Sequence, residues 1–258
     1  MNILSTNNIL IVGGGISGRR FVESYMFDDN INITIAGFAY KNKSIDLSIK
    51  YMVAYVNFED IIDFNFYDVI ILSVPYEIKR KCLKKIISNK FVGKLIIEKP
   101  FAINCSDYYE MINLLGNNLF CIPFSRRYDK RFDIKIDRET HIIWPMDEYK
   151  EVSIYYDLLP HCIDWIVRGI GKEPEQIEVL IKTKNIYRFM VNGILINIEF
   201  VNNRHNNVTV NDIEFPWIDI YKINNIMLIK LIRQTSRDEQ LEKDMYYVSK
   251  IMEVLDNR

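Results

Sequence analysis

A glycine-rich turn near the N-terminus places the strongest constraint on the fold. Residues 8–12 form a short apolar, β-branched run typical of a buried strand, and residues 19–25 are typical of a helix. Between them the chain fits G-x-G-x-x-G, in which glycine allows a tight turn, close approach of a pyrophosphate and close packing of helix on strand. We expect this turn to bind a dinucleotide, and a simple glycine turn is the alternative. The expected cofactor-binding residues here are Gly13, Gly15, Ile16, Ser17 and Gly18.

The segment after the second expected strand, residues 31–38, bears on the choice of cofactor. An NAD site carries an acidic residue there to hold the ribose 2′-hydroxyl. No acidic residue follows this strand until Asp46, and the intervening Lys41, Lys43 and Ser44 could bind a 2′-phosphate. We therefore predict NADP(H) over NAD(H), with Ala39, Tyr40, Lys41 and Lys43 at the cofactor. A solvent-exposed turn with no ligand is the alternative.

The chain divides into two regions with different patterns. Up to residue 122, strands expected at 68–74, 94–97 and 119–122 alternate with helices at 76–89 and 106–115, which predicts a doubly wound parallel sheet. From residue 123, strands expected at 177–182, 187–191, 194–201, 208–210 and 217–221 predict a mostly antiparallel sheet, with a hairpin turn at Asn192-Gly193. Helices are expected at about 158–169 and 238–255. We predict an α/β Rossmann domain over 1–122 and an α+β domain over 123–258.

Bulk properties exclude several classes of protein. The 258 residues carry a net charge of −1, so nothing suggests nucleic acid as a partner. No apolar run is long enough to span a membrane and no signal peptide is present, which favours the cytoplasm. The four cysteines and three histidines show no metal-ligand spacing, so we expect free thiols and no metal.

Five segments, in this order, resemble the Gfo/Idh/MocA family of oxidoreductases. They are residues 13–18, 71–75, 98–102 (Glu-Lys-Pro-Phe-Ala), 124–129 and 157–164. The resemblance implies a Rossmann domain followed by an open-faced sheet, and hydride transfer at a sugar-like carbon. It places Ser73, Val74, Pro75, Glu98 and Lys99 near the nicotinamide. It also implies that Arg126, Arg127, Tyr128 and Asp164 contact the substrate.

The same resemblance assigns the catalytic positions to Lys99, Asp157 and His161. Lys99 follows a strand at the edge where parallel sheets bind ligands, and a lysine there can donate to the reacting oxygen. Asp157 and His161 are four residues apart and would share a helix face. His161 could then exchange a proton with the substrate oxygen. A helix N-cap is the alternative role for Asp157.

Two departures from the family pattern fall at the expected substrate pocket. Only residues 130–156 separate the second-domain segment from Asp157, without the expected glycines, and Leu159 replaces a family glycine. We predict an NADP(H)-dependent oxidoreductase acting on a sugar or nucleotide-sugar alcohol or ketone, in a biosynthetic direction. A C=N reductase and a non-catalytic NAD(P)-binding regulator are the alternatives. Alternating apolar residues in 194–200 suggest a sheet face that a second subunit covers, so we expect a homodimer or homotetramer.

Overall fold

The computed structural model describes residues 6–38, 43–146, 154–202, 207–216 and 218–257. The chain forms two compact units. Unit 1 contains residues 1–98, 111–123 and 219–237, and unit 2 contains residues 99–110, 124–218 and 238–258. The division is therefore not a single cut after residue 122. Each unit is built on its own six-stranded sheet, one parallel and one mostly antiparallel, which confirms the predicted fold class. Helix α4 (Cys105–Leu115) contributes residues to both units.

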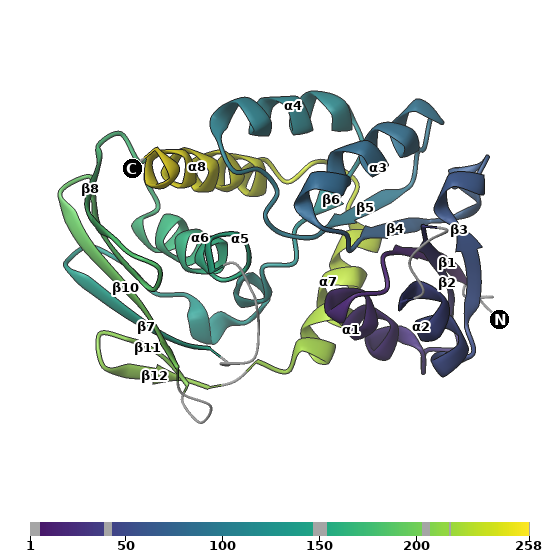
Figure 1. Cartoon of the computed structure of the whole chain (residues 1–258), viewed down its shortest axis with the longest axis horizontal. Coiled ribbons are helices and arrows are strands. Elements are labelled where there is room, and N and C mark those ends of the chain that lie inside the picture. Colours follow the sequence, from purple (N-terminus) through teal and green to yellow (C-terminus); the bar gives the residue numbers. More distant parts are fainter. Residues whose placement is uncertain (1–5, 39–42, 147–153, 203–206, 217, 258) are drawn as a thin grey trace. The chain divides into compact units, whose positions relative to one another are not determined.

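Unit 1 is a doubly wound parallel sheet with the strand order β3-β2-β1-β4-β5-β6. Helices α1 and α2 lie on one face of this sheet and α3 on the other (Figure 1). Strand β4 and residues 9–12 of β1 are apolar because both faces of the sheet are covered there, and Ile9, Leu10 and Ile11 are completely buried. The elements are β1 (Asn7–Val12), α1 (Ile16–Tyr25), β2 (Ile31–Gly37), α2 (Lys43–Tyr51), β3 (Ala54–Asn57), β4 (Val69–Leu72), α3 (Tyr76–Ser88), β5 (Lys94–Ile97), β6 (Phe120–Cys121) and α7 (Ile220–Arg233).

Helix α7 corrects the sequence interpretation, which placed a strand over residues 217–221. Asp219 caps this helix by accepting hydrogen bonds from the amides of Tyr221 and Lys222, each at 3.1 Å. The helix packs on α1, where the Tyr25 hydroxyl donates to the Asn224 main-chain oxygen at 3.0 Å. An aromatic, β-branched run thus became helical because a capping aspartate precedes it and tertiary packing buries one of its faces.

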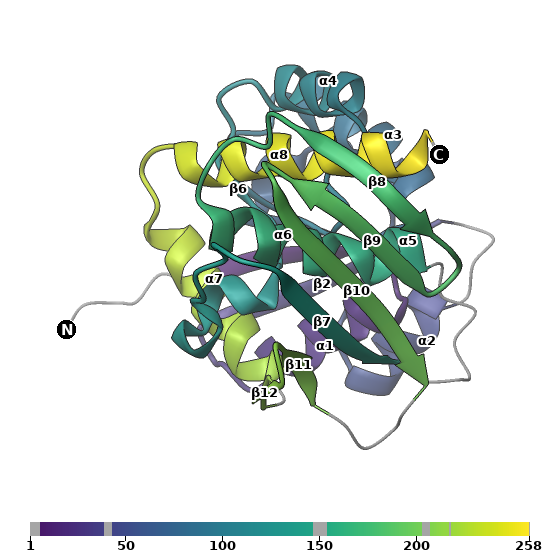
Figure 2. The same ribbon diagram turned by 90° about the vertical axis from the view of Figure 1, so that its left-hand side faces the viewer.

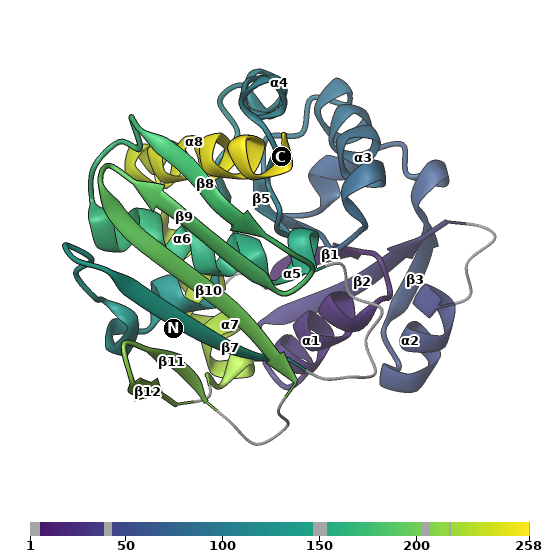
Figure 3. The same cartoon turned by 60° about the vertical axis from the view of Figure 1, so that its left-hand side comes forward.

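Unit 2 is a mixed sheet with the order β12-β11-β7-β10-β9-β8, in which only the pair β7–β10 is parallel among the described residues. One face of the sheet packs against α6 and α8 (Figure 2). The expected hairpin at Asn192-Gly193 joins β9 to β10, with both residues at positive φ (50° and 79°). Figure 3 shows the same strands from a second angle. The elements are β7 (Thr140–Met146), α5 (Ile154–Asp157), α6 (Leu159–Ile170), β8 (Ile177–Lys182), β9 (Ile186–Val191), β10 (Ile194–Asn202), β11 (Val208–Val210), β12 (Ile213–Phe215) and α8 (Glu239–Asp256).

The alternating pattern of β10 has a different cause from the one we expected. Ile196, Ile198 and Phe200 are completely buried within unit 2. Their face is therefore covered by this chain's own helices and is not left for a second subunit.

Among the described residues no helix is both long and apolar enough to cross a bilayer.

Candidate functional site

The glycine-rich turn lies at the end of β1, and two of its glycines are required by packing. Gly13 has φ +108°, and a Cβ atom there would lie 2.2 Å from the main-chain oxygen of Ser73. A Cβ atom on Gly18 would lie 2.0 Å from the oxygen of Gly13. Any larger residue at either position would push β1, α1 and β4 apart.

Gly15 differs, because a Cβ atom there would meet nothing within 4 Å. It is the N-cap of α1, no side chain caps this helix, and its first turn, which begins with the exposed Ile16, holds no acidic residue. Amides at such a helix end are suited to an anion. Beside Gly18, the Ser73 hydroxyl is buried without a hydrogen-bond partner among the described residues. The open space, the amides at the start of α1 and this hydroxyl fit a pyrophosphate group.

The start of α2 lies beside the ends of β1 and β2. A Cβ atom on Gly37 would lie 2.6 Å from the Cβ of Ser44, and the buried Ser44 hydroxyl donates to the Ala36 oxygen at 3.3 Å. Ser44 therefore serves the packing of α2 on β2, whereas Lys43 is exposed at the first position of the helix. The expected cofactor residues Ala39, Tyr40 and Lys41 lie outside the described residues.

Glu98, the residue directly after β5, is held at three points. Its amide donates to the Leu72 oxygen at 3.0 Å, and its carboxylate accepts a hydrogen bond from the Ser17 hydroxyl of α1. The Lys79 ammonium, only 1% exposed, donates to the Glu98 main-chain oxygen. Sequence analysis missed Lys79, because its place within a helix rich in lysine resembled a solvent-exposed face. Val74 is buried and Pro75 is the exposed N-cap of α3.

In unit 2, Lys99 and Asp157 are paired. The Lys99 ammonium donates to the main-chain oxygen of Asp157 at 2.8 Å and forms an ion pair with its carboxylate. Asp157 is the last residue of α5, and α6 has Leu158 as its N-cap with no side-chain cap. The structure thus contradicts the helix-capping alternative for Asp157, whose carboxylate binds Lys99 instead.

His161 is the third residue of α6, so it and Asp157 lie on two successive helices and not on one helix face as the sequence predicted. Its side chain lies against two aromatic rings. Its imidazole stacks on Trp144, with ring centroids 5.9 Å apart and planes inclined by 21°, and meets the edge of Phe124 at 5.5 Å. Trp144 is a contact that the sequence interpretation missed, because no strand was expected over β7. Lys99, Asp157, His161 and Trp144 all belong to unit 2.

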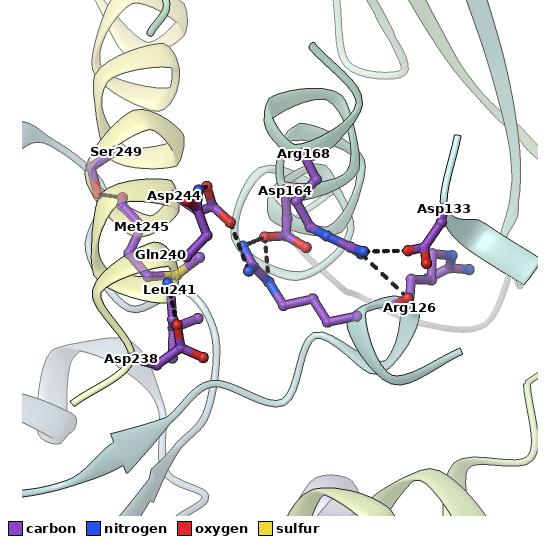
Figure 4. A network of polar contacts seen from close by, with 11 residues as sticks. Arg126, Asp133, Asp164, Arg168, Asp238, Gln240, Leu241, Asp244, Met245 and Ser249 are labelled. Carbon is purple, nitrogen blue, oxygen red and sulfur yellow. Dashed lines mark hydrogen bonds and ion pairs between the residues drawn. The ribbon is translucent and has the colours of Figure 1, made fainter. Parts of the chain in front are cut away.

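The two neighbouring arginines expected at the substrate have different surroundings. Arg127 forms ion pairs with Asp164 and, at 2.8 Å, with Asp244, and both carboxylates are almost completely buried. Burial opposes the charge on Arg127, but its two carboxylate partners outweigh burial and raise its pKa. Figure 4 shows these acids between α6 and α8. This closed network gives Arg127 and Asp164 a structural role, and Asp164 does not share the surroundings of His161 and Asp157. Tyr128 is half-buried in a 3₁₀ turn, Ser125–Tyr128.

Arg126, by contrast, lies among aromatic rings. Its guanidinium carbon is 3.9 Å from the ring centroid of Trp144 and 5.3 Å from that of Phe132. Trp144 therefore contacts both Arg126 and His161.

Comparison with known proteins bears on the dinucleotide-binding part of the chain. The Gfo/Idh/MocA family model, described as an oxidoreductase family with an NAD-binding Rossmann fold, matches residues 7–118. This match indicates an NAD(P)-dependent oxidoreductase. No match was found among curated protein sequences.

Solved structures resemble this chain over nearly its whole length. A myo-inositol 2-dehydrogenase from Lactobacillus plantarum has a TM-score of 0.75 at 14% identity, with 98% of this chain and 97% of that chain covered. A myo-inositol dehydrogenase from Lactobacillus casei, in complex with NAD(H) and myo-inositol, has a TM-score of 0.76 at 10% identity, covering 98% and 94%. A 3-ketoreductase from Actinomadura kijaniata, in complex with NADP, has a TM-score of 0.75 at 9% identity, covering 98% of both chains. These matches establish the two-domain fold, and they include complexes with either dinucleotide.

Proposed function

We propose that this protein is an NADP(H)-dependent reductase or dehydrogenase that acts on a carbohydrate-like alcohol or ketone. The observation that carries the proposal is the pairing of Lys99 with Asp157, close in sequence to His161 on α6. An ammonium, a carboxylate and an imidazole within one unit can polarise an oxygen and exchange its proton. The solved structures of similar fold include a dehydrogenase in complex with myo-inositol and a 3-ketoreductase, which supports the substrate class.

The cofactor would be held by the glycine-rich turn and the strand ends around it. Gly15 leaves room for a pyrophosphate, the first amides of α1 donate to it, and the Ser73 hydroxyl supplies a further polar group. Lys43, exposed at the start of α2, would bind a 2′-phosphate together with Lys41. The nicotinamide, when bound, supplies or accepts the hydride.

Residues of unit 2 would then act on the substrate. Lys99 donates a hydrogen bond to the carbonyl oxygen and stabilises the charge that develops there on reduction. Asp157 fixes the position of the Lys99 ammonium through two contacts. His161 gives a proton to that oxygen during reduction and takes one during oxidation, and its stacking on Trp144 fixes the plane of the imidazole.

We further propose a biosynthetic direction, with a sugar or nucleotide-sugar as substrate, because NADPH commonly serves reduction. The cytoplasmic location expected from the sequence stays a prediction.

Calorimetric titration of the protein with NADPH and with NADH tests the cofactor assignment directly. We expect tight binding of NADPH and weaker binding of NADH. Equal affinities for the two dinucleotides would contradict the proposal that Lys41 and Lys43 bind a 2′-phosphate. If folded protein binds neither dinucleotide, the proposed function is overturned.

A further inference from the structure

The guanidinium of Arg126, a half-buried residue, has no anionic partner among the residues that the structure describes. No carboxylate forms an ion pair with it, and its Nε is buried without a hydrogen-bond acceptor. Two carboxylates of this unit form ion pairs with other arginines: Asp133 pairs with Arg168 at 2.6 Å, and Asp164 pairs with Arg127 (Figure 4). The main-chain oxygen of Arg126 is an acceptor, for Arg168 at 3.4 Å.

Aromatic rings take the place of a counter-ion. The guanidinium carbon lies 3.9 Å from the ring centroid of Trp144, 5.3 Å from that of Phe132 and 5.9 Å from that of Trp165. The faces of such rings attract a cation, though less strongly than a carboxylate does. Burial lowers the pKa of Arg126 to about 10, so the side chain is still charged at neutral pH. A desolvated charge with an unsatisfied N–H is costly to maintain without a ligand.

The position of this cation connects it with the candidate catalytic group. Trp144 contacts both Arg126 and the His161 imidazole. A group bound by Arg126 would therefore belong to the same ligand with whose oxygen His161 exchanges a proton. A neutral hydroxyl could accept from Nε, but it would leave the guanidinium charge uncompensated. A carboxylate or phosphoryl group matches both the charge and the paired N–H groups of a guanidinium edge.

We infer that Arg126 binds an anionic group of the substrate, so that the substrate is a sugar-like compound carrying a carboxylate or a phosphoryl group. The inference rests on the proposed function, since it assigns the chemistry of the molecule that Lys99 and His161 act on. It separates the two adjacent arginines by role: Arg127 neutralises buried acids of the protein, and Arg126 neutralises an acid of the ligand.

Arginine Nε–H resonances give a direct test with simple probes. The protein labelled with ¹⁵N at arginine is titrated with acetate and, separately, with inorganic phosphate, at an ionic strength held constant with sodium chloride. Arg126→Lys identifies the Arg126 resonance by its disappearance. We expect that resonance to shift saturably, while the resonance of Arg127 stays fixed because its acceptors belong to the protein. The exposed Arg188 on β9 is the reference for nonspecific binding.

A resonance of Arg126 that shifts no more than that of Arg188 would overturn the inference. The anion that shifts it at lower concentration distinguishes a carboxylate from a phosphoryl substrate. Should Arg126→Lys fail to fold, the intrinsic tryptophan fluorescence gives a second readout, because Trp144 and Trp165 both lie close to the Arg126 guanidinium. In that case Arg126→Gln should weaken the apparent affinity for the preferred anion by roughly 30-fold, the loss typical of a buried charge pair.

Repeating the titration on protein saturated with NADPH separates this inference from the proposed function. A shift of Arg126 that persists with NADPH bound assigns the anion to the substrate and not to the cofactor phosphates. Dinucleotide binding with an unresponsive Arg126 would refute the anion site alone. A responsive Arg126 in protein that binds neither NADPH nor NADH would refute the proposed function alone.

Discussion

Lys99 and Asp157, separated by 58 residues in the sequence, form a two-point contact. The lysine ammonium donates to the main-chain oxygen of the aspartate at 2.8 Å and pairs with its carboxylate. The lysine side chain is 13% exposed and the aspartate side chain 44% exposed, so the lysine is the more enclosed partner. Two contacts with one residue fix the ammonium more firmly than a surface ion pair does. This geometry suits a lysine that must present a proton to a substrate oxygen.

Replacement of Lys99 by alanine should abolish most turnover while leaving dinucleotide binding intact. The variant loses the donor to the reacting oxygen, and such a group contributes about 10²–10⁴-fold. Steady-state kinetics should show the loss in kcat, and calorimetry with NADPH should show an unchanged Kd. A variant with near-normal kcat would contradict the assignment. If His161→Ala lowers kcat much more than Lys99→Ala does, reduction of a C=N bond becomes the better interpretation.

Two glycines of the same turn should respond differently to alanine. Gly15→Ala places a methyl group in open space, so the free energy of unfolding should change by less than about 0.5 kcal/mol. The methyl group would nevertheless occupy the space proposed for the pyrophosphate, and the Kd for NADPH should rise markedly. Gly13→Ala should instead cost more than about 2 kcal/mol, because of its φ of +108° and the 2.2 Å approach to Ser73. Urea unfolding measures the change in stability of the two variants, and calorimetry measures their affinity for NADPH. Normal NADPH binding by Gly15→Ala would show that the pyrophosphate does not lie beside Gly15.

The cofactor preference should reverse when an acid is placed after β2. Ala39→Asp introduces a carboxylate that repels a 2′-phosphate and can accept from a 2′-hydroxyl. The ratio of KM for NADPH to KM for NADH should rise by about tenfold or more, equivalent to about 1.4 kcal/mol. Asn30→Asp makes the same change of charge at an exposed position before β2 and should leave the ratio unaltered. An unchanged ratio in Ala39→Asp would show that residue 39 does not lie at the ribose.

Local patterns in the sequence predicted most of the dinucleotide-binding unit. The predicted strands are short apolar runs, the turn requires glycine, and α1 and α3 follow their strands as expected. The antiparallel part of unit 2 was also predictable, because Asn192-Gly193 fixes a hairpin. The sequence analysis did not predict α2, β3, β7 or α7. Residues 140–146 lack clear alternation, and α7 depends on the cap at Asp219 and on packing against α1.

The candidate site was predicted in composition but not in arrangement. Lys99, Asp157 and His161 were named from motifs, yet the ion pair of Lys99 with Asp157 depends on how the chain folds between them. The sequence could not separate Arg126 from Arg127, because two adjacent arginines carry the same charge. Only the positions of Asp164, Asp244 and Trp144 in the fold give them different surroundings. Lys79 was missed because its burial also depends on the fold: its acceptor is the main-chain oxygen of Glu98, 19 residues away.

Self-association should involve the outer face of the second sheet. The face with Ile196 and Phe200 is covered within the chain, whereas Ile186, 38% exposed, lies on the opposite side. Light scattering at micromolar concentration should give the mass of a dimer or tetramer, and Ile186→Glu should lower that mass. Ile62→Glu, at an exposed position of unit 1, is the matched control and should not. A monomer for the unmodified protein would refute the expected homo-oligomer.

Arg127 should contribute to stability far more than its exposed neighbour Arg131. Arg127→Met leaves the carboxylates of Asp164 and Asp244 buried without a cation, which typically costs about 3–5 kcal/mol. Arg131, whose side chain is 54% exposed, pairs with Asp129, and Arg131→Met should have little effect on the free energy of unfolding because solvent screens this pair. Urea unfolding of the two variants measures both changes. A loss for Arg127→Met as small as that for Arg131→Met would show that the buried acids are protonated in the native protein. It would also free Arg127 for the substrate contact that the sequence first suggested.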